Sequence, residues 1–310
     1  WPWLGETEAE AKSNAGRSSR FDIPRLRAWQ VLFEYMQSKE VVPYIILEDD
    51  SAWTGYDYKR YYREIIARFG CLPAVVFNMG EEYRENYWLW TGVRRAKYFR
   101  SIDPYRHPLG IHDINKPERY YLDSSVFDFA AIQTKGKDSL VHNQIALHWQ
   151  QESLERDVRV PMISFDEPRP VLDRKGWWAA YLGGAVWQVH AVDPLDAAHP
   201  TREPIWTQLG GTRKFMESLP FCEMTPDNSV IIDGTGFALR KADEVIALYL
   251  PEGGRVSLSL SAGKKYHVDW WNPENGFDDS FMRREVFSAD RVVLQAPTAA
   301  DWAARLEKID

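Results

Sequence analysis

Two adjacent glutamates stand where an apolar segment of the sequence ends. Residues 74–77 are all apolar, and Asn78 and Gly80 follow them before Glu81 and Glu82. An apolar run of this length, bounded by turn residues, indicates a strand that is buried on both faces, as in a parallel sheet. Acids at the carboxyl end of such a strand lie where α/β barrels hold their catalytic groups. The alternative is an acidic first turn of the next helix, which the helix dipole would favour.

A second acidic pair, Asp166 and Glu167, follows the apolar segment 158–165. Hydrolysis of a glycosidic bond needs two carboxyl groups that face each other. One protonates the leaving oxygen, and the other attacks the anomeric carbon or activates a water. The two acidic pairs lie three predicted strands apart, so a barrel would place them on opposite sides of its mouth. Because adjacent strand residues point in opposite directions, we expect one acid of each pair to face the cleft, and the choice between Glu81 and Glu82 stays open.

Other polar and aromatic residues near predicted strand ends are candidates for binding a sugar. Glu48 ends the segment 41–47, and its carboxylate could bind substrate hydroxyls. For His112 and Gln133, a hydrogen bond within their own loop is an equally common role. A tryptophan near a strand end can stack on a sugar ring, although most tryptophans fill the core. The candidate substrate-binding residues are Glu48, Asn78, Glu81, Tyr83, His112, Gln133, Asp166 and Trp187.

The elements that would position these residues alternate along the first 219 residues. Asp22 and Asp57 are predicted to cap helices, whereas residues 4–20, which are polar and contain Gly and Ser, are predicted to form a loop. Six apolar segments that alternate with helical patterns indicate a parallel sheet with helical crossovers. Polar residues at most strand ends and the lack of a glycine-rich phosphate loop favour a barrel over a dinucleotide-binding fold. The expected strands are 41–47, 74–77, 109–112, 126–132, 158–165 and 183–188.

The pattern changes at residue 220. Val256, Leu258 and Leu260 alternate with serines, which is the period of a half-buried antiparallel strand. Turns rich in Gly, Asn, Asp and Pro separate several segments of this kind. We therefore expect an α/β barrel over residues 1–219 and a small antiparallel β-sandwich over residues 220–310.

Composition narrows the possible partners. The chain has 310 residues, and its 14 tryptophans favour a carbohydrate ligand, because indoles stack on sugar rings. A net charge of −7, with both signs interspersed, argues against a nucleic-acid partner. Cys71 and Cys222 lack metal-ligand spacing and are predicted to be buried thiols, and no metal or other cofactor is expected. No apolar run has the length of a membrane span. Two tryptophans of the C-terminal region, Trp270 and Trp271, are expected to pack against the barrel.

Several motifs together resemble those of the apiosidase-like glycoside hydrolases. They are Tyr61–Gly70, Phe77–Glu82, Asp103–Pro108 and Asp166–Pro168, and Trp271–Gly276 resembles the signature of an appended β-domain labelled collagen-binding. The resemblance implies a (β/α)₈ TIM barrel and a retaining mechanism, with the acid/base after strand four and the nucleophile after strand seven. By position, Glu82 would be the acid/base and Glu167 the nucleophile. Glu81 stands where many relatives of the wider clan have Asn.

The resemblance also implies that two barrel strands precede Trp1. We therefore expect this chain to hold six of eight strands, with a missing N-terminal segment or a second chain completing the barrel. The expected function is that of a retaining glycoside hydrolase acting on a plant, algal or microbial polysaccharide in an extracytoplasmic compartment, periplasmic or secreted. A carbohydrate-binding or attachment protein that has lost catalysis is the alternative.

Overall fold

The computed structural model describes residues 2–17, 20–48, 56–83, 88–114, 122–134, 139–157, 161–166, 174–188, 202–274 and 284–309. The chain forms two compact units. The first comprises Trp1–Ile132 and Ser153–Val160, and the second comprises Gln133–Glu152 and Pro161–Asp310. The expected domain division at residue 220 stays a prediction.

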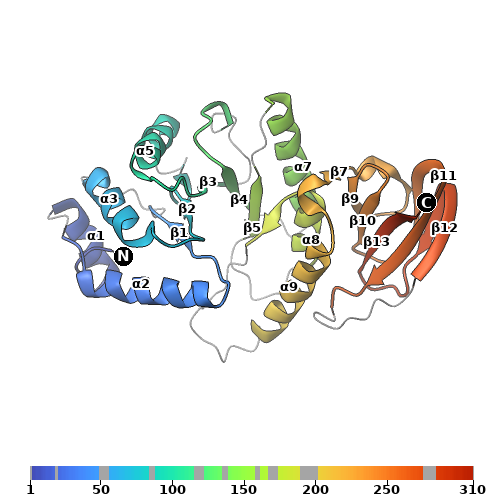
Figure 1. The fold of residues 1–310 in the computed structure, drawn as a ribbon, viewed down its shortest axis with the longest axis horizontal. Coiled ribbons are helices and arrows are strands. Elements are labelled where there is room, and N and C mark those ends of the chain that lie inside the picture. Colours follow the sequence, from blue (N-terminus) through green and yellow to red (C-terminus); the bar gives the residue numbers. More distant parts are fainter. Residues whose placement is uncertain are drawn as a thin grey trace. The chain divides into compact units, whose positions relative to one another are not determined.

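Helices and parallel strands alternate in the first unit (Figure 1). Tyr44 of the first strand pairs with Val76 of the second, and Phe77 pairs with Leu109 of the third. This alternation of strand and helix is the one that the sequence predicts. The elements are α1 (Glu8–Arg17), α2 (Ile23–Ser38), β1 (Tyr44–Ile46), α3 (Tyr58–Phe69), β2 (Val76–Asn78), α5 (Leu89–Ile102), β3 (Leu109–Ile114) and β4 (Phe129–Thr134), whose last two residues belong to the second unit.

Aspartates begin two of these helices, as predicted. At the start of α2, the Asp22 side chain accepts a hydrogen bond from the Arg25 amide at 3.0 Å. At the start of α3, the Asp57 side chain accepts hydrogen bonds from the amides of Lys59 and Arg60 at 3.1 Å. Both caps supply acceptors for amides that have no partner within the first helical turn, and they thereby fix where the helices begin.

The prediction of a loop over residues 4–20 is wrong, because α1 occupies Glu8–Arg17. The Glu10 amide donates to the Thr7 hydroxyl at 3.2 Å, and the Thr7 amide donates to the Glu10 carboxylate at 3.4 Å. This reciprocal arrangement is a capping box, which starts a helix. The helix begins with Ala, Glu and Lys, which are strong helix formers and outweigh the Gly and Ser around them.

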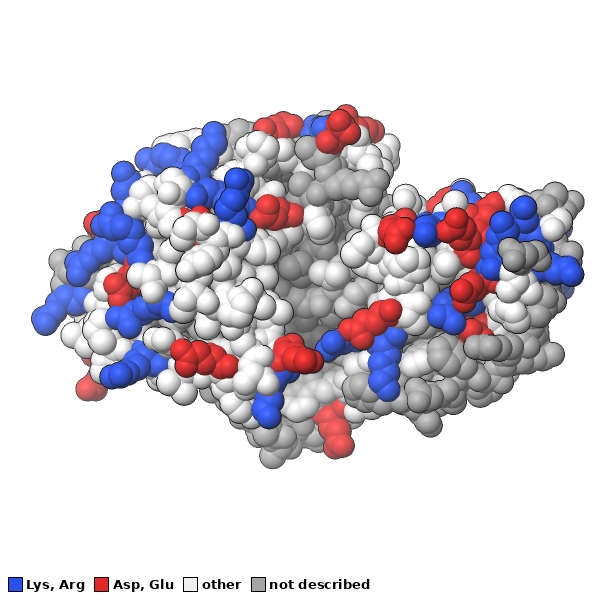
Figure 2. Space-filling view, in the orientation of Figure 1, with Lys and Arg blue, Asp and Glu red and all other residues white. Residues whose placement is uncertain are grey.

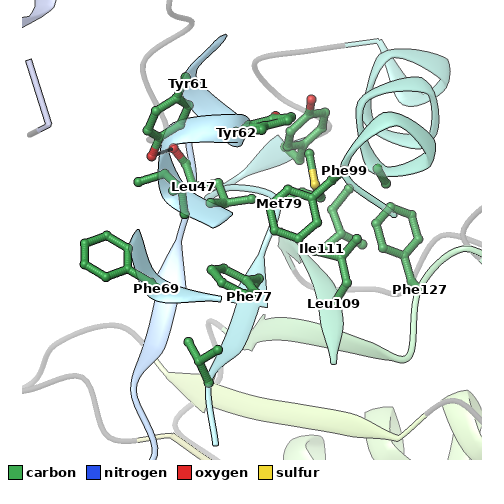
Figure 3. Close-up of a cluster of buried hydrophobic side chains, with 14 of the residues drawn as sticks. Leu47, Tyr61, Tyr62, Phe69, Phe77, Met79, Phe99, Leu109, Ile111 and Phe127 are labelled. Carbon is green, nitrogen blue, oxygen red and sulfur yellow. Dashed lines mark hydrogen bonds between the residues drawn. The ribbon is translucent and has the colours of Figure 1, made fainter. Parts of the chain in front are cut away.

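Strand residues of the first unit alternate between two faces of the sheet. On one face, the Asn78 amide donates to the Tyr44 hydroxyl at 2.7 Å, and the Tyr44 ring lies 6.0 Å from the ring of Phe129. A Cβ atom at Gly110 would lie 2.1 Å from the Phe129 ring, so only glycine lets this ring cross the strand. On the other face, the strands pack on α3 and α5 through a buried cluster that includes Leu47, Tyr61, Tyr62, Phe69, Phe77, Met79, Phe99, Leu109 and Ile111 (Figure 3).

The second unit contains further parallel strands and an antiparallel sheet (Figure 1). Ile163 of β5 pairs in parallel with Val186 of β6. The described parallel strands follow the order β1-β2-β3-β4-β5-β6. The elements are α7 (Ser139–Glu155), β5 (Met162–Asp166), α8 (Arg174–Leu182), β6 (Val186–Trp187), α9 (Arg202–Glu217), β7 (Thr225–Pro226), β8 (Ile231–Asp233), β9 (Phe237–Lys241), β10 (Val245–Leu250), β11 (Arg255–Trp271), β12 (Arg284–Gln295) and β13 (Trp302–Ile309).

The antiparallel sheet has seven described strands in the order β12-β11-β13-β10-β9-β7, with β8 paired to β11. Its strands β11 and β12 are longer than expected, because the sequence indicates two separate segments for each: 255–260 and 265–271 for β11, and 281–287 and 291–295 for β12. In β11 the pairing with β12 shifts between Ser259 and Lys264, and Gly263 adopts a φ of 70° there. An irregularity of this kind bends a strand without ending it, and it produces the same local turn signal in the sequence.

Aromatic side chains join α8 and α9 to the antiparallel sheet. Trp178 stacks on Tyr249 with ring centroids 5.3 Å apart, and the ring of Trp271 lies 6.1 Å from that of Phe215. Trp271 therefore packs against helices, as expected. Trp270 instead belongs to the buried cluster of the antiparallel sheet itself, where it contacts Trp302 edge-on at 6.4 Å.

Two expectations about the fold need qualification. The described parallel strands number six, two fewer than the eight of a closed (β/α)₈ barrel, so a mixed α/β fold with a parallel and an antiparallel sheet is what the structure shows. The prediction of buried thiols is wrong, because Cys71 and Cys222 are both exposed. Cys71 directly follows Gly70, the C-cap residue of α3. Cys222 lies in a single turn of 3₁₀ helix after α9. Both cysteines thus stand in short connections between elements.

Candidate active site

The carboxyl ends of β1, β2 and β3 bring several candidate residues together in the first unit. The Glu81 amide donates to the Glu48 carbonyl at 3.1 Å, and the Met79 amide donates to the Gly110 carbonyl at 2.9 Å. These bonds hold the three strand ends side by side. A Cβ atom at Gly80 would lie 3.0 Å from the Glu48 carbonyl oxygen, so glycine permits the close approach of the first two ends.

His112 holds the two candidate acids that follow β2. Its Nδ1 atom lies 2.8 Å from a carboxylate oxygen of Glu81 and 2.9 Å from the amide nitrogen of Glu82. A protonated Nδ1 donates to Glu81, whereas an unprotonated Nδ1 accepts the Glu82 amide hydrogen. The His112 side chain is completely buried, and its Nδ1 carries a proton in the first arrangement and none in the second. The position of that proton therefore decides which glutamate His112 binds.

Glu82 has a left-handed backbone, with a φ of 42°. A non-glycine residue in this region costs roughly 1–3 kcal/mol and persists where the surroundings enforce it. The bond from the Glu82 amide to His112 is one such constraint. Strained residues of this kind are enriched at active sites, where the strain sets the direction of a side chain. The assignment of Glu82 as acid/base stays a prediction.

Glu48 lies at the centre of a buried polar network. Its carboxylate accepts hydrogen bonds from the hydroxyls of Tyr56, at 2.6 Å, and Tyr62, and it forms an ion pair with Arg95 of α5. Burial raises the pKa of the Glu48 carboxyl, while Arg95 and the two hydroxyls act in the opposite direction. Burial lowers the pKa of the Arg95 guanidinium, but Glu48 and the nearby tyrosines outweigh this effect and raise it. Arg95 therefore remains charged and balances the Glu48 carboxylate.

Arg95 is not among the site residues predicted from the sequence, although a signal for it exists. Arg94 and Arg95 are adjacent on α5, whose inward positions Val93, Ala96 and Phe99 are buried. Two consecutive residues of a helix point in directions about 100° apart, so one of the two arginines lies closer to the apolar stripe than the other. The one nearer the apolar stripe is the one expected to reach a buried carboxylate.

Asn78 and Tyr83 flank the two glutamates. The Asn78 side chain links the strands, because its amide donates to the Tyr44 hydroxyl and its oxygen accepts the Gly80 amide at 3.2 Å. Burial raises the pKa of Tyr44, and the charge of Glu81 adds to the increase. The Tyr83 ring is fully buried, and a Cβ atom at Gly92 of α5 would lie only 2.9 Å from it. Tyr83 thus anchors the segment after β2 to α5.

The remaining candidates lie in the second unit. Gln133 is buried near the end of β4, and Trp187 is half-buried and contacts His142 edge-on at 5.0 Å. Asp166 is the last residue of β5. Glu167 lies outside the described residues, so its expected position opposite Glu82 stays a prediction.

A cavity of about 510 Å³ lies beside β1 in the first unit. It extends from α2 along the strand to the two carboxylates Glu48 and Glu81. Most of its wall is apolar, and the chain segments that form it are Pro2, Trp29, Leu32, Phe33, Tyr44–Glu48, Tyr61, Ile65, Phe69 and Glu81. The cavity is thus mainly apolar, and Glu48 and Glu81 line it at the carboxyl ends of β1 and β2.

No protein-family model matches the sequence, and a search of curated proteins finds no match. Solved structures do resemble the chain. A glycoside hydrolase of family 5 from Bacteroides vulgatus is 14% identical, with 91% of this chain and 74% of that one covered and a TM-score of 0.73. A second structure, described as a glycoside hydrolase, is 16% identical, with 81% and 68% covered and a TM-score of 0.64. The chain has the fold of glycoside hydrolases.

More distant glycoside hydrolases share this fold. A family 27 β-L-arabinopyranosidase from Geobacillus stearothermophilus is 7% identical, with 92% of this chain and 78% of that one covered and a TM-score of 0.54. In this chain, Glu81 and Glu82 follow the carboxyl end of β2, which pairs in parallel with β1 and β3. Among the described residues, no cluster of His, Cys, Asp and Glu could hold a metal ion, and no helix is long and apolar enough to cross a membrane.

Proposed function

We propose that the protein is a retaining glycoside hydrolase that cleaves a complex plant, algal or microbial polysaccharide. The observation that carries this proposal is the pair Glu81 and Glu82 at the end of β2, held by His112 in a chain with the fold of glycoside hydrolases. The resemblance of several motifs to those of apiosidase-like enzymes and their appended β-domain adds support. The mechanism needs no metal or other cofactor, and an extracytoplasmic location suits a polymeric substrate.

In the proposed mechanism, Glu82 is the acid/base and Glu167 is the nucleophile. The Glu167 carboxylate attacks the anomeric carbon, the glycosidic C–O bond breaks, and the leaving oxygen takes the proton of Glu82. Glu82, now ionised, removes a proton from water, which displaces Glu167 from the sugar and restores both groups. The two carboxyl groups of a retaining enzyme lie about 5–5.5 Å apart, and we expect this separation for Glu82 and Glu167.

We also propose that two further strands complete the barrel, supplied by an N-terminal segment or a second chain. Among the described strands, β2 is the one that pairs with β1. Beside it, Leu32 of α2 is 50% exposed and Ile46 is 37% exposed, which are large fractions for apolar side chains along a cavity. A parallel sheet normally has both faces and both edges covered.

The amide of Ile46 tests this second proposal. The Leu47 amide donates to the Asn78 carbonyl at 2.8 Å, and alternate residues of a parallel strand donate to the same neighbour. The Ile46 amide therefore points away from β2. It should exchange with solvent slowly when a further strand pairs with β1. Exchange at the rate of an open amide in the complete protein would contradict the proposal.

Digestion of a panel of polysaccharides tests the proposed activity. We expect the wild-type chain to release reducing sugar from at least one member, with a product that first appears in the anomeric form of the substrate. Glu167→Gln and Glu82→Gln should each lower the rate by at least about a hundredfold. A chain that binds a polysaccharide tightly and cleaves no member of the panel would support the non-catalytic alternative. A product of the opposite anomeric form would contradict retention.

A further inference from the structure

The helices α3 and α5 expose a set of positive charges on adjacent surfaces. The exposed cations are Lys59, Arg60 and Arg63 of α3 and Arg94 and Lys97 of α5, and we refer to them as the basic face. Figure 2 shows Lys and Arg gathered over these two helices. Within the part of the chain that the structure describes, none of the five is paired with a carboxylate. Unpaired cations on neighbouring helices repel one another, so an anionic ligand would stabilise them.

Aromatic rings lie between these cations. The rings of Tyr58 and Tyr98 meet edge-on at 5.8 Å and join the two helices. The Lys59 ammonium lies 5.3 Å from the centre of the Tyr98 ring. The Arg94 guanidinium lies 5.9 Å from the centre of the Tyr58 ring and 5.0 Å from that of Trp90. Stacking of this kind orients a guanidinium and leaves the N–H groups at its edge available to a carboxylate.

Two exposed tryptophans lie at the start of α5. Trp88 is 77% exposed and Trp90 is 53% exposed, whereas most tryptophans of a folded protein are largely buried. A flat indole at the surface is suited to the C–H face of a sugar ring. The Arg94 guanidinium lies beside the Trp90 ring, so an apolar surface and a cation are available to the same ligand.

The basic face begins next to the candidate active site. The helices α3 and α5 follow β1 and β2, so their first turns lie at the same edge of the sheet as Glu48 and Glu81. Arg95, the neighbour of Arg94, forms the ion pair with Glu48. A polymer bound along the basic face would therefore have one end close to the carboxylates of the strand ends.

We infer that the basic face binds an anionic polysaccharide whose charges are uronate carboxylates. Charge complementarity calls for a polyanion, and the surface indoles together with the glycoside hydrolase fold favour a glycan over a nucleic acid or an anionic membrane. The inference rests on the proposed function in one respect, because only a glycoside hydrolase would use the bound polymer as a substrate. It adds the chemical class of that substrate and a surface that binds it outside the carboxylate pair.

The test compares binding to alginate, a linear polyuronate, with binding to carboxyl-reduced alginate, its neutral counterpart. The double variant Arg63→Gln/Arg94→Gln removes two cations of the basic face. The matched control Arg27→Gln/Lys39→Gln removes two exposed cations outside the basic face, Arg27 on α2 and Lys39 directly after it. Binding is measured by calorimetry at several salt concentrations, and Glu82→Gln is included in every arm to prevent cleavage.

We expect the wild-type surface to bind alginate at least about tenfold more tightly than the reduced polymer, with an affinity that falls as salt rises. Arg63→Gln/Arg94→Gln should weaken alginate binding at least about fivefold and lower the slope of log affinity against log salt by up to about one per cation removed. The control should match the parent. Trp90→Ala should weaken binding to both polymers and leave the salt slope unchanged, because an indole contributes contact area and no charge.

Equal affinity for the two polymers, or unchanged alginate binding in the double variant, would overturn the inference. So would tighter binding of a single-stranded oligonucleotide or of phosphatidylserine vesicles than of alginate. The digestion panel is read separately. Cleavage of neutral glycans without alginate binding would refute the basic face and leave the proposed activity intact, whereas charge-dependent alginate binding without cleavage of any glycan would refute the activity alone.

Discussion

Nδ1 of the buried His112 lies 2.8 Å from a carboxylate oxygen of Glu81. The same nitrogen lies 2.9 Å from the Glu82 amide, so one imidazole controls both candidate acids. Glu81 is engaged through its side chain and Glu82 through its backbone.

Replacement of His112 should impair both activity and stability. In His112→Phe an aromatic ring remains but the hydrogen bond of Nδ1 is lost, and we expect the unfolding free energy to fall by about 1–3 kcal/mol. The rate of glycan cleavage should fall by about ten- to a hundredfold, because Glu82 loses the contact that fixes its backbone. Urea unfolding and the rate on an active polysaccharide measure the two effects. His148→Phe, at a histidine whose side chain is 59% exposed, should change neither.

The two glutamates should differ in their effect on the pH profile. If Glu82 is the acid, the rate declines on the alkaline side as Glu82 loses its proton, and Glu82→Gln removes that decline. Aryl glycosides with good leaving groups need little protonation, so Glu82→Gln should slow their cleavage far less than that of a polysaccharide. Glu81→Gln should keep the alkaline decline. The reverse pattern would assign the acid to Glu81.

Arg95 should be required mainly as the counter-charge of Glu48. Arg95→Met leaves a buried carboxylate without its cation and should lower the unfolding free energy by about 3–5 kcal/mol. The double variant Glu48→Gln/Arg95→Met removes both charges and should be more stable than Arg95→Met alone. Arg68→Met breaks the partly exposed pair with Glu64 and should cost at most about 1 kcal/mol. Additive effects of the Glu48 and Arg95 substitutions would contradict the coupling.

Stability should decline with rising pH above the ordinary pKa of tyrosine, and Tyr61 should contribute to this decline. Burial, with a further contribution from Glu48, raises the pKa of Tyr61, whose hydroxyl donates to the Leu47 carbonyl at 2.8 Å. Above about pH 10 the unfolded chain releases this proton while the folded chain retains it, so unfolding becomes more favourable. In Tyr61→Phe the unfolding free energy should fall less steeply with pH, by up to about 1.4 kcal/mol per pH unit. Urea unfolding between about pH 9 and 11 measures it, and Tyr105→Phe, at a residue that is 64% exposed, should follow the wild type.

A methyl group at residue 110 should disrupt the face of the sheet that carries Tyr44 and Asn78. The added Cβ atom of Gly110→Ala would meet the Phe129 ring at 2.1 Å, and overpacking of this kind costs about 1–3 kcal/mol. The double variant Gly110→Ala/Phe129→Leu should recover part of the loss, since the smaller side chain leaves room. Equal stability of the two variants would show that the ring moves aside without cost.

The sequence predicts features that depend on local patterns. Asp22 and Asp57 cap their helices as expected, and the apolar run before Glu81 is a buried parallel strand. The helix after Thr7 is not predicted, because the Gly and Ser residues of this segment favour a loop and the capping box between Thr7 and Glu10 is a weaker signal in the sequence. The long strand β11 is divided in the prediction because an irregularity and a turn share the same residues.

Features that depend on contacts between distant segments are not predictable in this way. The sequence around Glu48, which follows β1, does not indicate that its carboxylate meets Arg95 of α5, 47 residues away. The shared role of His112 likewise requires β2 and β3 to be aligned so that the histidine of one strand reaches the glutamates of the other. The sequence marks such residues as candidates, and the alignment of strands decides their partners.

The backbone conformation of Glu82 lowers the stability of the protein, whereas its side chain is required for the proposed activity. A glycine would adopt a φ of 42° without strain, so Glu82→Gly should relieve a cost that the native residue imposes on folding. It would also remove the carboxyl group on which the proposed chemistry depends. Screens that select variants for heat resistance alone would therefore enrich inactive chains at this position. Engineering for robustness should hold residue 82 fixed and seek stabilising changes elsewhere.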